Sequence, residues 1–282
     1  MSVAGLASVT SIAVPPRTFR NELRAIKIVW HRDMIRFLRD KPRIITALLQ
    51  PMLYLFVLGS GLGSAVPRAS GVDLRMFMFP GVMAMAVLFT CFFSAGSMVW
   101  DREFGFMREM LVAPVNRGAI LVGKCFGGAT VGTLQGLVMF AVAGLVGVPY
   151  SPALMIGVFA ELVLLSFAIT ALAVMISARI RSMQAFMALV QMLMMPLFFL
   201  SGALFPLTGL PGWLTVLTRL DPLTYAVDPI RRLVLAYAAP GMPFVGVTWQ
   251  SWIVPTWLEL ALVAATAFCA LGVAILQFRR AD

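Results

Sequence analysis

Six long apolar runs divide the chain, and they constrain its fold more than any other feature of the sequence. They lie at about 44–62, 77–99, 119–148, 153–177, 185–205 and 252–277. A helix needs ~20 consecutive apolar residues to cross the hydrocarbon core of a bilayer. The sequence therefore predicts an all-α polytopic membrane protein, in which residues 1–282 form a single transmembrane domain with six transmembrane helices.

The distribution of charge predicts the orientation in the membrane. With 61% hydrophobic residues and a mean hydropathy of +0.94, the chain has too little polar surface for a water-soluble domain. Counted by the loops between the six runs, seventeen Lys and Arg side chains lie on the side of the N-terminal arm and five on the opposite side. By the positive-inside rule, both termini are cytoplasmic and the protein is a multi-pass protein of the plasma (inner) membrane. The net charge of +10 therefore reflects the basic residues of the cytoplasmic loops, and we expect no nucleic-acid partner.

The N-terminal arm, residues 17–42, has the pattern of an amphipathic helix. Its apolar positions recur at steps of three and four, at Phe19, Leu23, Ile26, Trp30 and Phe37, with basic residues largely on the other side. Such a helix lies in the interface plane and favours anionic lipid headgroups. The alternative is a solvated basic leader with accidental periodicity. Pro42 is expected to separate this helix from the first span.

The segment 206–238 cannot form a single spanning helix. Prolines and glycines break it into pieces too short to cross the bilayer, although its apolar residues continue throughout. Backbone that is not helical at membrane depth has to be shielded by protein. The pattern therefore predicts short re-entrant helices that dip into the outer leaflet between spans five and six.

Polar residues inside the predicted spans are candidates for a transport path. Charged side chains are expensive in hydrocarbon, so acids there often mark ion or substrate pathways. The candidates are Glu161, Glu259, Gln135, Gln184 and Gln191. The alternatives are that Glu259 lies near the outer headgroups, that Glu161 is protonated or hydrogen-bonded to a neighbouring helix, and that the glutamines only join helices. If Glu161 couples transport to ions, the chain is a secondary transporter driven by protons or sodium.

The third run contains two further motifs. Glycines at Gly123, Gly127, Gly128, Gly132 and Gly136 are spaced for close approach of neighbouring helix backbones. Residues 118–125 match G-x-x-x-x-G-K, but Cys125 stands where a phosphate loop needs a hydroxyl, and the motif opens an apolar span. The only histidine, His31, has no acid or nucleophile pattern around it, and the three cysteines have no metal-ligand spacing. We therefore expect no enzyme activity, no metal and no cofactor in this chain.

The cytoplasmic segment 100–118 joins the second and third runs and carries both signs of charge around an apolar stripe. Mixed charge of this kind favours docking onto a protein over docking onto an anionic membrane. A solvated connection is the alternative. The residues predicted to dock are Asp101, Arg102, Glu103, Phe104, Gly105, Met107, Arg108 and Glu109.

Several motifs resemble those of the ABC-2-type exporter permeases, and the resemblance is closest to the daunorubicin-resistance-type branch of drug and lipid exporters. It covers nearly the whole chain, and the family commonly has Asn at the position of Asp221. The motifs are Asp101-Arg-Glu-x-Gly, Leu111-Val-Ala-Pro114, Arg117 with Gly123-Lys124, Leu200-Ser-Gly-Ala-Leu-Phe-Pro206, Asp221-Pro-Leu-Thr-Tyr225 and Asp228-x-x-Arg231.

The resemblance implies a function and partners. Two permeases, identical or related, would pair around a central path, and each would bind a separate nucleotide-binding ATPase subunit that holds ATP and Mg. Residues 100–118 would form the coupling helix. The outer re-entrant gate would include Pro206, Asp221, Pro222, Tyr225, Asp228 and Arg231. The expected function is export of an amphipathic drug, lipid or glycolipid from the cytoplasm or inner leaflet, and Met-rich and Phe-rich spans suit such substrates.

Overall fold

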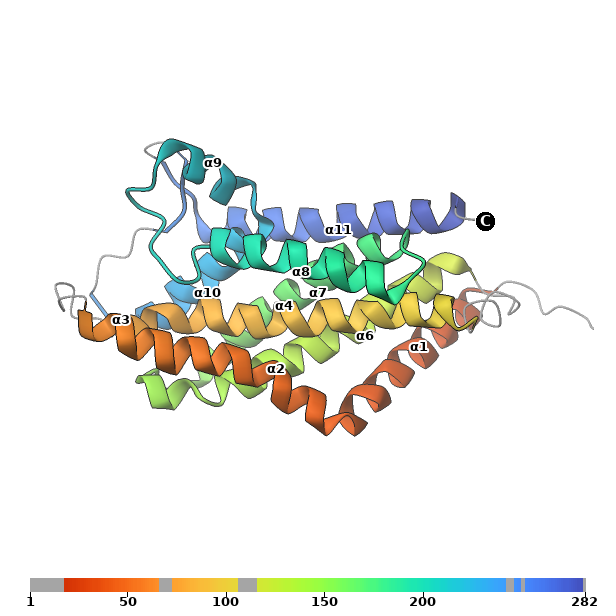
Figure 1. The fold of residues 1–282 in the computed structure, drawn as a ribbon, viewed down its shortest axis with the longest axis horizontal. Coiled ribbons are helices and arrows are strands. Elements are labelled where there is room, and N and C mark those ends of the chain that lie inside the picture. Colours follow the sequence, from red (N-terminus) through yellow and green to blue (C-terminus); the bar gives the residue numbers. More distant parts are fainter. Residues whose placement is uncertain (1–17, 66–72, 106–115, 242–245, 250–251, 281–282) are drawn as a thin grey trace, which may run out of the picture.

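Long helices lie side by side along one axis and form most of the protein (Figure 1). The computed structural model describes residues 18–65, 73–105, 116–241, 246–249 and 252–280. The elements are α1 (Phe19–Arg39), α2 (Lys41–Leu53), the π-helical η1 (Tyr54–Leu58), α3 (Gly59–Ala65), α4 (Leu74–Glu103), α6 (Arg117–Phe140), the 3-10 helix η2 (Ala143–Val146), α7 (Pro152–Ser177), α8 (Met183–Leu200), α9 (Gly212–Leu220), α10 (Pro222–Ala238), β1 (Thr248–Trp249), β2 (Trp252–Ile253) and α11 (Thr256–Arg280).

Five of the described helices are long and apolar enough to cross a membrane. They span Lys41–Gly63, Leu74–Glu103, Pro152–Ser177, Met183–Leu200 and Thr256–Phe278. The chain is therefore a polytopic helical membrane protein, as the apolar runs predicted. The third predicted run forms α6, which is 24 residues long but is not among these five, because Lys124, Gln135 and its many glycines lower its hydropathy.

The predicted spans differ from the helices chiefly at their ends. The run 119–148 forms a helix only as far as Phe140, and η2 follows before the chain turns at Gly147, whose φ is +82°. The run 185–205 stops being helical after Leu200, and Gly202 has a φ of +68°. The run 252–277 becomes helical at Thr256, because residues 252–253 pair with 248–249 in a small antiparallel hairpin. Hydropathy indicates which residues favour lipid, and apolar residues continue past the helix ends, so it does not locate those ends.

The amphipathic helix forms as predicted, but much of its apolar face packs on protein. Val29 and Phe37 are buried against the bundle, and the indole of Trp30 donates a hydrogen bond to Thr130 of α6 at 3.0 Å. Ile26 is half-buried, whereas Phe19 and Leu23 are exposed. The C-terminal part of the helix therefore packs on protein, and the placement of the helix in the membrane interface stays a prediction.

The helix break after α1 falls at Asp40 and precedes Pro42. The Asp40 carboxylate accepts a hydrogen bond from the backbone N–H of Arg43, which caps α2. Pro42 occupies the first turn of α2, where its missing N–H is not needed.

The core of the bundle lies around α4. Of the most apolar 18-residue window of α4, 78% is buried inside the protein, compared with 17% for the span Lys41–Gly63 and 22% for α8. Figure 1 shows α4 between the first span and α8, with α6 and α7 on its other side. The first span and α8 therefore present most of their surface to lipid or to another protein.

Glycines of α6 allow three helices to approach it, as their spacing predicted. A Cβ atom on Gly127 would lie within 3 Å of the Asp33 side chain on α1. One on Gly128 would meet Thr170 of α7, and one on Gly132 would meet Cys91 of α4, both within 3 Å. Because no larger residue fits at these contacts, the glycines set the spacing of the bundle.

Candidate coupling and transport sites

A cluster of buried charges joins three helices at the end of the bundle that holds Phe19, Glu103 and Arg117. The distribution of basic residues predicts that this end is cytoplasmic, and it is called the cytoplasmic end below. The cluster, called the cytoplasmic cluster, consists of Arg32 and Asp33 of α1, Ser97 and Asp101 of α4, and Lys124 of α6.

Lys124 is the centre of the cytoplasmic cluster. Its Nζ atom lies 3.1 Å from Asp33 Oδ1, 3.4 Å from Asp101 Oδ2 and 2.7 Å from the Ser97 hydroxyl. Arg32 completes the cluster with an Nη2 to Asp101 Oδ2 distance of 2.7 Å. The Lys124 side chain is 2% exposed, and both carboxylates are almost as deeply buried. Burial removes water from each charge, and the interactions with its partners compensate for this desolvation.

The last turn of α4 is also bonded to the α7–α8 connection. Arg102 donates hydrogen bonds to the backbone carbonyls of Ser177 and Ile180, the latter at 2.8 Å. Glu103 accepts a hydrogen bond from the backbone N–H of Met183 at 2.8 Å, at the start of α8. The end of α4 is thus connected to α1, α6, α7 and α8, and a displacement of this turn would reach all four.

Two exposed aromatic residues lie where α4 ends. Trp100 and Phe104 pack against each other with ring centroids 4.9 Å apart, and they are 47% and 60% exposed. The helix stops at Gly105, whose φ of +84° favours glycine. Of the predicted docking residues, Met107, Arg108 and Glu109 lie outside the described residues.

A second cluster of charges lies at the opposite end of the bundle, called the outer end. Arg232 of α10 contacts Asp228 at 2.7 Å and Glu259 of α11 at 3.2 Å. Asp228 also accepts a hydrogen bond from the backbone N–H of Val247 at 3.2 Å, next to the β hairpin. Glu259, which was predicted as a path candidate, is fully buried in this ion-paired group, and its role in a path stays a prediction.

Arg231 stabilises the non-helical backbone that follows α8. Its guanidinium donates to the carbonyls of Gly202 and Ala203, at 2.7 and 3.4 Å, and to the carbonyl of Phe77 on α4. It also lies over the Phe77 ring, 4.2 Å from the centroid, and it is 1% exposed. The arginine therefore satisfies carbonyl groups that the end of α8 leaves without helical partners.

The other predicted gate residues lie at and near the start of α10. Asp221 caps this helix by accepting a hydrogen bond from the backbone N–H of Leu223, and burial raises the pKa of Asp221 to about 7. Pro222 occupies the first turn, and the Tyr225 hydroxyl accepts a hydrogen bond from the Trp249 indole at 3.0 Å. Pro206 precedes this group in the connection between α8 and α9.

The structure does not bring the predicted path residues together. Gln135 is fully buried and donates to the carbonyl of Ile44 at 3.3 Å, which joins α6 to the first span. Glu161 is half-buried on α7. Gln184 and Gln191 are both exposed on α8, seven residues apart and thus on one face of the helix.

Four members of these clusters, Arg32, Asp33, Ser97 and Arg232, were not identified from the sequence. Lys124 entered only through the resemblance and as the lysine of the motif at residues 118–125. Lys124 interrupts an apolar run, so the rule that drew attention to Glu161 also applies to it. Its partner Asp33 is 91 residues away in the chain, and helical periodicity carries no information about such a pairing.

The fold and these sites define a polytopic α-helical membrane protein whose buried charges are paired at the two ends of the bundle. Residues 24–235 match the family model described as ABC-2 type transporter. Because the match covers most of the chain, the protein belongs to the ABC-2 type transporter family and is a transport permease. ABC permeases pair with ATPase subunits.

Relatives of known name agree with this assignment. The chain is similar to the transport permease ycf38 of Cyanophora paradoxa, with 30% identity over 216 residues, 75% of this chain and 74% of the relative. It is also similar to nodulation protein J of Rhizobium meliloti, with 30% identity over 73% of this chain and 80% of the relative. The inner membrane transport permease YadH of Escherichia coli K12 is 25% identical over 73% of this chain and 81% of its own length.

Proposed function

We propose that this permease forms the membrane half of an ATP-driven exporter, in which two permease chains and two separate ATPase subunits move an amphipathic drug, lipid or glycolipid out of the cytoplasm or the inner leaflet. In this proposal α6 is the third of six spans, and α9 and α10 are re-entrant helices at the outer end. The observation that carries the proposal is the bonding of the last turn of α4 to four other helices, directly before the connection to α6.

The proposed coupling step uses this bonding. The ATPase binds the segment 100–118, and the exposed pair Trp100 and Phe104 supports a contact there. When the ATPase subunits close on ATP, they displace the end of α4. Asp101 transmits the displacement to α1 through Arg32, and Glu103 transmits it to the start of α8. Such a rigid-body change between two packed states alters access to the path.

The proposed path runs beside α8, where two permeases meet. Gln184 and Gln191 are exposed on a face that also carries Met192 and Met195. Amide side chains on a spanning helix are unfavourable against lipid, so this face suits a polar path or a second permease. The flexible methionine side chains suit amphipathic substrates of varied shape.

Charge reversal in the segment 100–118 tests the proposal. The tagged protein is purified in mild detergent from its native membranes, and co-purifying subunits and vanadate-sensitive ATP hydrolysis are measured. We expect an ATPase subunit that is lost in the Glu103→Lys, Arg108→Glu double variant. The control Arg181→Glu reverses an exposed charge in the α7–α8 connection and should retain it. A stable permease without any ATPase would refute the proposal, and loss of transport in Glu161→Gln with normal ATP hydrolysis would instead favour ion coupling.

A further inference from the structure

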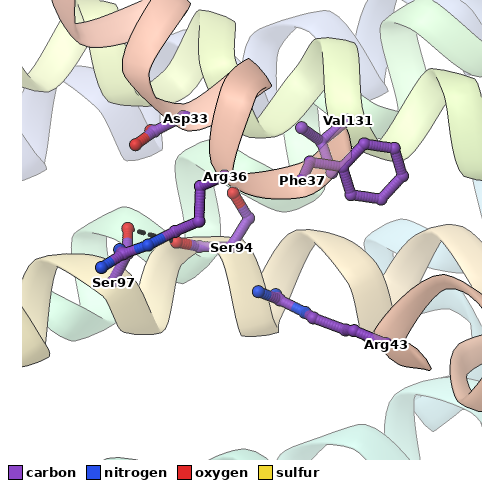
Figure 2. A pocket seen from close by; sticks show the side chains of 7 residues that line it. All are labelled: Asp33, Arg36, Phe37, Arg43, Ser94, Ser97 and Val131. Carbon is purple, nitrogen blue, oxygen red and sulfur yellow. Dashed lines mark hydrogen bonds between the residues drawn. The ribbon is translucent and has the colours of Figure 1, made fainter. Parts of the chain in front are cut away.

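A hollow of about 270 Å³, including its open mouth, lies at the corner where α1 turns into α2. Side chains of α1, α2, α4 and α6 line it: Asp33, Arg36, Phe37, Arg43, Ser94, Ser97 and Val131. Figure 2 shows Arg36 and Arg43 reaching toward the same stretch of α4 from two different helices, with Ser94 between them. Two cationic side chains and a hydroxyl therefore line one small hollow.

The two arginines lack an acidic partner in the part of the chain that the structure describes. Neither guanidinium forms an ion pair there. Asp33, the acid in the lining, is already bonded to Lys124 at 3.1 Å. Arg43 is half-buried, with its guanidinium 5.8 Å from the centroid of the Phe93 ring. Asp40 lies near enough to favour the charged form of Arg43 but forms no ion pair with it, and Arg36 adds a second positive charge nearby. A partly desolvated guanidinium without a paired counter-charge favours an anion in the hollow.

The hollow lies beside the start of the first span, and a spanning helix begins near the phosphate groups of the bilayer. The first span begins at Lys41, so Arg43 is in its first turn at the cytoplasmic end. Residues 32–43 contain five cationic and two anionic side chains, a net charge of +3. Exposed apolar side chains at Leu38, Ile45 and Leu49 flank the same corner and offer contacts for acyl chains. Basic residues next to a spanning helix attract anionic lipids.

We propose that this corner binds the phosphate group of an anionic membrane lipid, with Arg36 and Arg43 as the charged ligands and the Ser94 hydroxyl as a further donor. The guanidinium group matches phosphate because it presents parallel N–H donors in a fixed plane. The bound lipid neutralises the half-buried Arg43 and holds the α1–α2 corner at the headgroup level. This proposal is independent of the exporter's substrate and of its ATPase.

Native mass spectrometry of the purified full-length chain tests the proposal. Phosphatidylglycerol or phosphatidylcholine is added in detergent, and the retained lipid is counted. We expect one phosphatidylglycerol to be retained in preference to phosphatidylcholine, and Arg36→Gln with Arg43→Gln to weaken its retention about tenfold or more. The control Arg39→Gln with Lys41→Gln removes the same charge from exposed neighbouring positions and should retain the lipid. Equal loss in both double variants would overturn the site.

Two further measurements separate a specific site from misfolding and from binding of free phosphate. Arg36 is exposed, so Arg36→Gln alone should fold normally and still weaken retention of phosphatidylglycerol. Phosphatidylglycerol should raise the thermal unfolding temperature of the natural chain more than that of Arg36→Gln. Displacement of the lipid by a modest excess of inorganic phosphate, or equal retention of phosphatidylcholine, would overturn the assignment to an anionic lipid.

Discussion

Replacing Lys124 with methionine keeps most of the side-chain length and removes the ammonium group that lies between Asp33 and Asp101. Two buried carboxylates then lose a partner at 3.1 and 3.4 Å, and the Ser97 hydroxyl loses one at 2.7 Å. Removing one member of a buried ion pair costs about 3–5 kcal/mol. Arg32 stays 2.7 Å from Asp101 and is partly exposed, so it compensates one carboxylate. We therefore expect a loss near the lower bound, about 3 kcal/mol.

The free energy of unfolding is measured in mixed micelles of dodecyl maltoside and increasing SDS. The control Lys27→Met removes an exposed cation from α1 and should change stability by less than about 0.5 kcal/mol. The double variant Asp33→Asn with Lys124→Met leaves the Arg32–Asp101 pair balanced, and it should be more stable than Lys124→Met alone. The reasoning fails if Lys124→Met loses less than about 1 kcal/mol, or if the double variant is the least stable of the three.

Two further predictions concern the spacing of α6 and the cap of α10. Gly128→Ala places a methyl group within 3 Å of Thr170 and should lower the free energy of unfolding by about 1–3 kcal/mol. The control Gly272→Ala points into open space and should be neutral. Equal effects of the two substitutions on unfolding in SDS would contradict this prediction. Because burial raises the pKa of Asp221 to about 7, the folded state keeps a proton that the unfolded state releases near pH 4, so the free energy of unfolding should fall by roughly 2 kcal/mol between pH 5 and 7. Asp221→Asn keeps an acceptor for the Leu223 N–H and should remove this dependence in detergent melting curves; an unchanged pH profile would refute the assignment.

The sequence predicted the helices better than the contacts between them. Apolar runs identify spanning helices because lipid selects for hydropathy over ~20 residues. The glycine steps of α6 predicted close packing because only small residues permit it, and Gly127 and Gly132 lie at such contacts. The hydropathy of residues 141–148 did not distinguish the end of α6 from its interior, because the turn and η2 are also apolar.

The sites were less predictable because they depend on partners distant in the chain. Asp101 was predicted as a docking residue, and its burial beside Lys124 follows from how α1 lies on α6. Arg231 was assigned to the gate by resemblance, but its contacts with the Gly202 and Ala203 carbonyls require the position of the α8 break in space. Whether the segment 100–118 docks an ATPase stays a prediction, and so do the roles of Glu161 and the α8 glutamines.

The burial of α4 has a consequence for how the protein is made. A ribosome delivers α4 to the bilayer before α6 and α7, the helices that later cover much of it. During that interval α4 must remain in lipid without α6 and α7, and its mean hydropathy of 2.1, close to that of the less buried α11 at 2.2, allows this. The glycine-rich α6 emerges afterwards, has no 18-residue window as apolar as that of α4, and carries Lys124. Its insertion therefore benefits from a surface already in place, and the order of the helices along the chain suits the order in which the nascent protein needs them.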